Sequence, residues 1–261
     1  MNVLVFDIET IPDLEAGRQL YGLEGLSDED VGKAMAHLRQ QKTGSEFMPH
    51  HLHRIVAISV VLRARDELRV WSLGNAQSGE AELLRRFYDG VERFSPVLVS
   101  WNGGGFDLPV LHYRSLLHGI SAGRYWEVGE EDQTFRYNNY LSRYHWRHID
   151  LMDVLAGFQS RASAPLDELA TLCGFPGKQG MAGDQVWSAW LDGRIDDIRD
   201  YCETDVLNTY LIYLRFELLR ARLDAGAYED ECERLRSLLA ASGRPHLQRF
   251  LEAWNAQRAP A

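Results

Sequence analysis

The sequence has few cysteines and no long apolar run, and both shortages narrow what the protein can be. Its 261 residues include three cysteines, Cys173, Cys202 and Cys232, and none of them belongs to a Cys-x-x-Cys pair. This pattern predicts neither a disulfide framework nor a zinc ribbon, and reduced thiols are expected. No segment approaches the length that spans a bilayer, and the first apolar run lacks the length and the basic leader of a signal peptide. We therefore expect a soluble, cytoplasmic protein.

Basic charge is also scarce. The chain has 28 Lys and Arg against 38 Asp and Glu, which gives a net charge of −10. This excess of acidic residues argues against a protein that coats nucleic acid through a broad basic surface. It does not exclude an enzyme that binds a few nucleotides. The sequence has no internal repeat and no low-complexity linker. Its length and its 45% apolar content fit one large α/β domain.

The apolar patterning predicts strands first and then alternating helices and strands. An apolar strand covers Val3 to Ile11, a helix capped by Ser27 follows, and residues 54–73 predict two β-runs around a polar turn at 65–67. Beyond them we expect a helix at 78–94, a strand at 96–101, a helix after 107, irregular structure at 119–148, and helices at 165–174, 198–223, 229–241 and 245–256. This order predicts a mixed sheet with helices on both faces.

Two carboxylates lie in the otherwise apolar first strand, "NVLVFDIETIP". Asp7 and Glu9 are two residues apart, so the alternation of a strand places both side chains on the same face. Like charges so close require a shared proton, a basic partner or a divalent cation. The alternative is that Glu9 ends the strand in water and Asp7 caps a turn.

Two other segments carry acids where chemistry could use them. Asp107 follows "SWNGGGF", where a buried strand gives way to a helix, although the segment is neither a Walker loop nor a dinucleotide-binding turn. Capping of that helix is the structural alternative for Asp107. In "YCETDVLN", Tyr201 and Asp205 are four residues apart and share one helical face, as a simple surface pair also would. Together the three segments predict four carboxylates and a phenol at one pocket, where two Mg²⁺ or Mn²⁺ ions would balance the charge.

In order and spacing, "FDIET", "NGGGFD" and "YCETD" resemble the three exonuclease motifs of the DEDD superfamily of proofreading 3′–5′ exonucleases. The tyrosine four residues before the last acid resembles the DEDDy subclass. The sequence segments "HRIVAIS" and "FDLPVL" are most similar to the exonuclease domain of family B DNA polymerases. The resemblance covers about residues 1–215 and implies a ribonuclease-H-like domain there, with a C-terminal helical extension at 216–261 packed on the same domain.

The resemblance also implies roles for single residues. Asp7 would bridge two metal ions, Glu9 and Asp205 would complete the shell of the first, and Asp107 would hold the second, largely through water. Tyr201 would orient the attacking water. Three further residues would contact the substrate: Thr10 through its backbone amide at the 3′ end, and Asn102 and Phe106 near the terminal nucleotide.

We therefore expect a metal-dependent 3′–5′ exonuclease that acts on single-stranded ends, with DNA favoured, and releases nucleoside 5′-monophosphates. Two rivals stay open: an RNA-trimming exonuclease, because no residue pattern identifies a sensor for the 2′-hydroxyl, and a noncatalytic nucleic-acid-binding module. A polymerase partner is compatible with this interpretation, although no residue pattern supports one, and no membrane partner is expected.

Four other features have less specific interpretations. The aromatic and basic segment 135–148 is suited to single-stranded nucleic acid, or else docks its aromatics on the core. "PHHLH" suggests zinc, but no matching acid or cysteine spacing accompanies it, and a polar turn before a strand is favoured. Asp150 and Asp153 either add to the acidic pocket or have structural roles such as capping, and the structural roles are favoured. The glycine-rich loop 177–183 either closes over substrate or is a flexible connection.

Overall fold

A five-stranded mixed sheet forms the centre of the protein. The computed structural model describes residues 2–65 and 67–257. The strands are β1 (Val3–Pro12), β2 (His53–Ala64), β3 (Glu67–Ser72), β4 (Val97–Ser100) and β5 (His148–Asp150). Their order is β3-β2-β1-β4-β5, in which β1 pairs antiparallel with β2 and parallel with β4. The expected antiparallel pair after the first strand is confirmed, although the turn at 65–67 includes Asp66, which lies outside the described residues.

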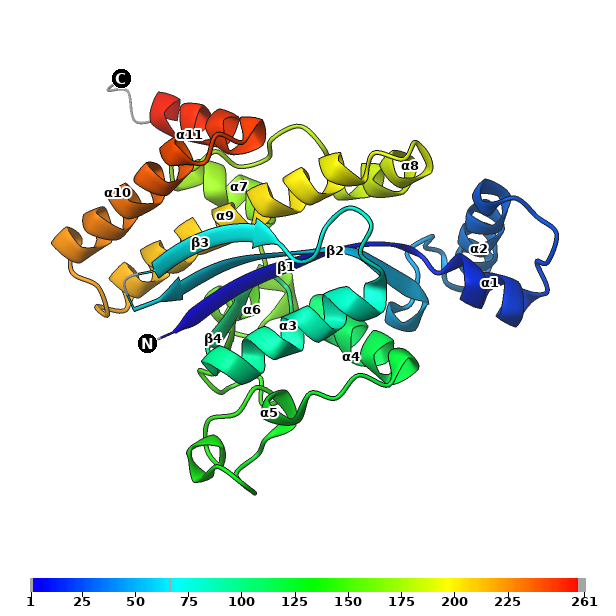
Figure 1. Cartoon of the computed structure of the whole chain (residues 1–261), viewed down its shortest axis with the longest axis horizontal. Coiled ribbons are helices and arrows are strands. Elements are labelled where there is room, and N and C mark those ends of the chain that lie inside the picture. Colours follow the sequence, from blue (N-terminus) through cyan, green and yellow to red (C-terminus); the bar gives the residue numbers. More distant parts are fainter. Residues whose placement is uncertain (1, 66, 258–261) are drawn as a thin grey trace.

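Helices cover both faces of this sheet, as the sequence predicts (Figure 1). Side chains alternate along β1 and so face two different cores. Leu4, Phe6 and Ile8 pack in one core with the helices at 80–94 and 107–118. Val3 and Val5 pack in the other core with the long helix at 195–219. The helices are α1 (Leu14–Tyr21), α2 (Asp28–Thr43), α3 (Glu80–Phe94), α4 (Asp107–His118), α5 (Gly123–Trp126), α6 (Leu151–Leu155), α7 (Leu166–Leu172), α8 (Val186–Leu191), α9 (Ile195–Leu219), α10 (Ala225–Ala241) and α11 (Pro245–Gln257). None of the described helices is long and apolar enough to cross a membrane.

The C-terminal helices share the core of α9. Tyr228 and Leu235 of α10 and Phe250 of α11 are buried in the same cluster as the α9 side chains. The helix expected at 229–241 begins four residues earlier, because the side chain of Asp224 caps it by accepting a hydrogen bond from the amide of Ala227 at 2.8 Å. The 25-residue helix α9 is thereby packed between the sheet and the two C-terminal helices, α10 and α11.

Helices α1 and α2 form an arm between β1 and β2 that projects beyond the end of the sheet where β1 ends (Figure 1). The arm has a small core of its own around Val31, Met35 and Leu52. The Ser27 cap of α2 is confirmed, since its side chain accepts from the amide of Asp30 at 3.2 Å. The arm also reaches α8, because a Cβ atom added at Gly32 would lie 2.8 Å from the Trp187 ring.

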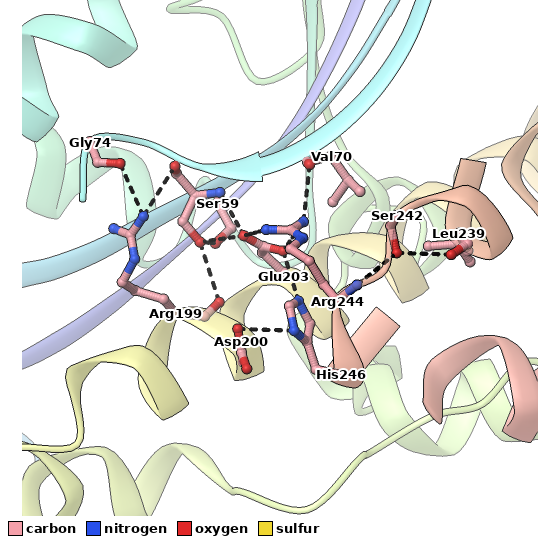
Figure 2. Close-up of polar contacts among 11 residues, drawn as sticks. Ser59, Val70, Gly74, Arg199, Asp200, Glu203, Leu239, Ser242, Arg244 and His246 are labelled. Carbon is pink, nitrogen blue, oxygen red and sulfur yellow. Dashed lines mark hydrogen bonds and ion pairs between the residues drawn. The ribbon is translucent and has the colours of Figure 1, made fainter. Parts of the chain in front are cut away.

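A buried carboxylate joins α9, β3 and the start of α11. Figure 2 shows Glu203 between Arg244 and His246. Glu203 is 2% exposed and accepts hydrogen bonds from the amide and the hydroxyl of Ser72, both at 2.8 Å. The Arg244 guanidinium lies 2.6 Å from it, and Nε2 of His246 lies 2.9 Å from it. These donors lower the pKa of Glu203 despite its burial, and the carboxylates of Asp200 and Glu203 raise the pKa of His246.

We predict that Glu203→Gln lowers the free energy of unfolding by about 3–5 kcal/mol, because it removes the buried charge that Arg244, His246 and Ser72 share. Urea denaturation measures this change. The matched control is Glu67→Gln, which breaks an exposed pair with Arg69 and should cost about 1 kcal/mol or less. Equal losses in the two variants would contradict a structural role for the Glu203 network.

Candidate active site

Asp7 and Glu9 lie side by side on the α9 face of β1, as the alternation predicts. The register between β1 and β2 shifts between Glu9 and Thr10, so a bulge immediately follows the second acid. Cys202 of α9 lies under the pair, with its Sγ 3.5 Å from both the backbone oxygen and Oδ2 of Asp7. One ligand atom from each of Asp7, Glu9 and Cys202 lies within 4.8 Å of the others. The acids therefore do not end in open water.

Asp107 is the first residue of α4 and is 4% exposed. The backbone of Ile8, between the two strand acids, is close enough to its carboxyl to act against the rise in the pKa of Asp107. The structural alternative of a helix cap is not what the structure shows, because Phe106 occupies the capping position and makes no side-chain cap bond. Asp107 thus reaches across from α4 to β1.

The loop before Asp107 is tied down by β5. Asp150 accepts hydrogen bonds from the amides of Asn102 and Gly104, both at 2.9 Å. It also caps α6 by accepting from the amide of Asp153 at 3.4 Å. Both contacts agree with the structural role expected for Asp150, and they fix Asn102, which has a left-handed backbone with φ of 63°. Asp150 therefore positions the loop that delivers Asp107.

Tyr201 and Asp205 project from one face of α9 toward the same place. The two groups act on each other's pKa, because the charge of Asp205 raises the pKa of Tyr201 and the phenol of Tyr201 acts to lower the pKa of Asp205. Burial and the neighbouring acids raise the pKa of Tyr201 well above its usual value, so the phenol keeps its proton. The strand acids, Asp107 and this pair come from three separate elements, yet each is close enough to shift the proton affinity of another.

The proton affinities show how crowded the acids are. Burial raises the pKa of Asp107 to about 7 and that of Asp205 to about 6. For Asp7 and Glu9, burial raises the pKa well above the usual range, and the charges of Asp107 and Asp205 raise it further. Without a compensating charge, these carboxyls hold protons that free acids would have lost.

The donor set fits hard divalent cations. Four carboxylates supply the oxygen ligands that Mg²⁺ and Mn²⁺ prefer. The soft donor present, Cys202, is fully buried, and burial together with the nearby acids raises the pKa of its thiol, so the protonated sulfur donates to Asp7. A hard-cation site is therefore the better match for these residues.

Lys178 is a residue of this site that sequence reasoning missed. The glycine-rich loop is anchored to α9, since Gly177 donates to Oδ1 of Asn208 at 3.2 Å and accepts from Nδ2 at 2.8 Å. Lys178 follows and lines a cavity of about 160 Å³ with Tyr201 and Asp205, where its charge lowers the pKa of Asp205. The signal available was composition: only three of the 28 Lys and Arg residues are lysine, and one of them lies in the glycine-rich loop that precedes the helix with the third acidic motif.

The histidines of "PHHLH" do not form a metal centre in the described part of the chain. His53 is buried, which lowers its pKa to about 4, and its neutral ring donates through Nε2 to the Met48 carbonyl at 3.0 Å. Its Nδ1 then accepts from the Thr10 hydroxyl at 2.9 Å. His50 donates through Nε2 to the Gly105 carbonyl at 2.9 Å. The polar turn favoured from the sequence therefore braces both Thr10 and the loop before Asp107.

The arginines of segment 135–148 are used mostly within the protein. Arg147 lies 3.7 Å above the buried Phe135 ring and donates to the Asn138 carbonyl. Arg143 makes two hydrogen bonds to Asp153, at 2.8 and 2.6 Å. These contacts favour docking on the core over a strand-binding role for the two arginines.

Comparison with known proteins agrees with the resemblance seen in the motifs. The model of a family described as "Predicted 3'-5' exonuclease related to the exonuclease domain of PolB" matches residues 45–254. The match begins after β1, so it omits Asp7 and Glu9, and it extends through α10 into α11, beyond the limit near residue 215 that the motifs suggested. No curated protein sequence matches the chain.

The solved structures give the same fold. Forty-three chains match, among them the family B DNA polymerase from the hyperthermophilic archaeon Pyrobaculum calidifontis, at 21% identity and a TM-score of 0.50. The similarity covers 84% of this chain and 24% of the polymerase chain, so this chain spans about a quarter of that protein. The expected α/β fold, a ribonuclease-H-like mixed sheet, is confirmed.

We predict that the metal-free protein loses stability as the pH rises from 4 to 8. The folded-state pKa values of Asp107 and Asp205 lie above the ordinary 3.8, so their contribution is fully present below that value and is lost as the pH passes about 6 and 7. One pKa unit corresponds to about 1.4 kcal/mol, so the loss should amount to a few kcal/mol. Denaturant unfolding in chelator measures it, and saturating Mg²⁺ should remove the trend.

Asp107→Asn should flatten this pH dependence, whereas Asp89→Asn, at an exposed position of α3, should leave it unchanged. The same slope in wild type and Asp107→Asn would show that Asp107 does not contribute to the effect.

Proposed function

Because the chain belongs to the family of predicted 3′–5′ exonucleases related to the exonuclease domain of PolB, we propose that it hydrolyses single-stranded nucleic acid from the 3′ end, with DNA favoured. The observation that carries the proposal is the meeting of four carboxylates and a neutral phenol from β1, α4 and α9 at one place. Residues 1–215 would form the exonuclease domain, and residues 216–261 would be a helical extension packed on it.

Asp7, Glu9, Asp107 and Asp205 would hold two divalent cations, Mg²⁺ or Mn²⁺. Such a pair supplies an ionised water near neutral pH and a partner for the departing 3′-oxygen. Glu9 and Asp107 are buried and Asp7 and Asp205 are half-buried, each on an element of the packed fold, which would limit the rearrangement that ligation requires. Their raised pKa values also mean that metal binding would displace protons from the cluster.

Tyr201 would orient the attacking water. Its phenol keeps its proton, and the phenol oxygen can still accept a hydrogen bond from that water. The water oxygen bonds to the terminal phosphorus as the bond from phosphorus to the 3′-oxygen breaks, and that oxygen takes up a proton. The products are a nucleoside 5′-monophosphate and a strand shortened by one nucleotide.

The strand end would be held by residues around the acids. We propose that Thr10 offers its backbone amide to the 3′ end, and that Asn102 and Phe106 lie beside the terminal nucleotide. Thr10 sits at the bulge next to Glu9, and Asn102 and Phe106 belong to the loop that Asp150 fixes. Lys178 would add positive charge for the phosphate beside Asp205.

We predict metal-dependent release of 5′-mononucleotides from single-stranded oligomers, absent in chelator. Asp7→Asn should reduce the rate by at least about 10³-fold because it removes the acid proposed to bridge both cations, and Tyr201→Phe should reduce kcat by about 10²-fold because orientation of the water is lost. Asp89→Asn is the matched control.

Parallel assays on DNA and RNA oligomers of the same sequence, resolved by chromatography of the products, measure these rates and the polymer preference. Binding of either polymer with no cleavage under Mg²⁺ or Mn²⁺ would reject the exonuclease and favour a binding module.

We predict that Lys178→Met reduces kcat by about 10-fold to 100-fold, because the side chain keeps its bulk but loses the charge that faces the proposed phosphate position. Thymidine 5′-(p-nitrophenyl phosphate), which lacks a strand, is the substrate that isolates this effect. Lys33→Met, on exposed α2, is the control. A loss confined to long oligomers would instead place Lys178 in strand binding.

A further inference from the structure

The end of the sheet where β1 begins, opposite to the arm (Figure 1), carries a groove. Its volume is about 920 Å³, and its walls come from the start of β1, the end of β2, the C-terminal half of α9 and the turn into α10. Val3, at its edge, precedes Asp7 by four residues of strand, or about 13 Å. Leu214 follows Asp205 by nine residues of helix, again about 13 Å. The groove is therefore separate from the candidate active site.

The floor of the groove is mostly apolar. Val154 and Leu223 are half-buried there, and Trp146 is 48% exposed. The ring of Phe216 stacks near that of Trp146, with their centroids 6.3 Å apart and their planes inclined by 22°. A partner that covers this floor would remove apolar area from water, which favours binding.

Four arginines and two acids also line the groove, in a chain whose net charge is −10. Two of the arginines are held by these acids. Arg63 donates two hydrogen bonds to Glu231, at 2.7 and 2.6 Å. Arg220 donates from Nε to Glu217 at 2.7 Å, and its guanidinium lies 4.7 Å from the centre of the Trp146 ring. Both acids of the lining are thus already used by arginines of the protein.

The other two arginines carry charge that the fold does not use. Arg65 follows β2 and Arg222 lies in the turn before α10, and both are exposed. Within residues 2–65 and 67–257, their side chains make no hydrogen bond or ion pair. A guanidinium can bind a carboxylate through two parallel N–H donors. The groove therefore matches a ligand that carries carboxylates beside a large apolar group.

The aromatic rings of the groove favour a peptide over a nucleic acid strand. Single strands are held largely by stacking of bases on open aromatic faces. Tyr210 and Tyr213 are buried, and the Trp146 ring is already in contact with Phe216 and Arg220. The volume is also close to the upper limit of small-molecule pockets, roughly 1,000 Å³, so a segment of chain fits it better than a small ligand.

We propose that this groove binds an acidic segment of a partner protein. Arg65 and Arg222 hold carboxylates of the segment, and one of its large apolar side chains covers Trp146 and Leu223. The inference goes beyond the proposed function, because the groove lies away from the acids and its occupation requires no catalysis. The contacts are between exposed charges in part, so the affinity falls as the salt concentration rises.

The test measures binding of a fluorescently labelled peptide, in which aspartates flank a Leu-Phe pair, to the full chain by anisotropy. Arg65→Glu and Arg222→Glu should each weaken binding by about 10-fold to 100-fold, the range expected for lost hydrogen bonds between charged groups. The matched control is Arg85→Glu, at an exposed position of α3 on the other face of the sheet, which should leave the affinity unchanged. A peptide of the same charge with Gly-Ser in place of Leu-Phe should bind at least about 10-fold more weakly, because it covers less of the apolar floor.

Two further measurements separate the other occupants. A labelled thymidine oligomer of the same net charge as the peptide, in chelator, should bind wild type and Arg222→Glu equally, and sedimentation of the protein alone should be the same for both. Loss of oligomer binding in the variant would assign the groove to nucleic acid, and a dimer that the variant dissociates would assign it to a second copy of the chain.

Either of these results would overturn the inference. So would the absence of peptide binding at low salt, equal peptide affinity in wild type and both arginine variants, or equal affinity for the peptides with and without the Leu-Phe pair. None of the measurements depends on cleavage, so a failure of the proposed function would leave the test of the groove intact.

Discussion

The rest of the site depends on repulsion among buried carboxylates. Asp7, Glu9, Asp107 and Asp205 share a region in which burial alone raises every pKa, and their mutual charge raises those of the strand pair further. Left to relax, such groups would move apart into water, because each charged form is costly in a site of low polarity. They stay together because each one belongs to an element whose position is fixed by apolar packing elsewhere: β1 between two cores, α4 in one of them and α9 in the other.

Polar contacts fix the loops near the acids, which apolar packing alone would leave free to move. Asp150 ties the loop before Asp107 to β5, and Asn208 ties the glycine-rich loop to α9. Glu203 lies between Tyr201 and Asp205 in sequence but faces away from the acids, toward β3 and the start of α11 (Figure 2). Consequently the C-terminal helices help to fix the helix that carries two of the proposed catalytic groups.

Local patterns predicted much of this. The two-residue spacing of Asp7 and Glu9 gave their common face, the apolar runs gave the strands and most helices, and the motif order gave the fold and the five acidic and phenolic residues. The remainder depends on contacts between residues far apart in the chain. Lys178 meets Asp205 only because Asn208 holds Gly177, and Phe47 meets Phe106 only because the arm folds back onto the loop after β4. In the same way, the spacing of "PHHLH" favoured a polar turn over a zinc site, but it did not show which distant residues the rings would contact.

The fixed positions of the four carboxylates have opposite consequences in the absence and in the presence of a cation. In the metal-free protein it holds like charges together, so it reduces the stability of the fold and forces the carboxyls to keep protons. A divalent cation at the proposed site would meet carboxylates that packing already holds near one another, so less of the free energy of attraction would be used to gather them. A flexible cluster would be more stable when empty and a poorer ligand set when filled. The neutral Tyr201 and the protonated Cys202 fit this scheme, because neither adds charge to the cluster and the Cys202 thiol donates a hydrogen bond to Asp7.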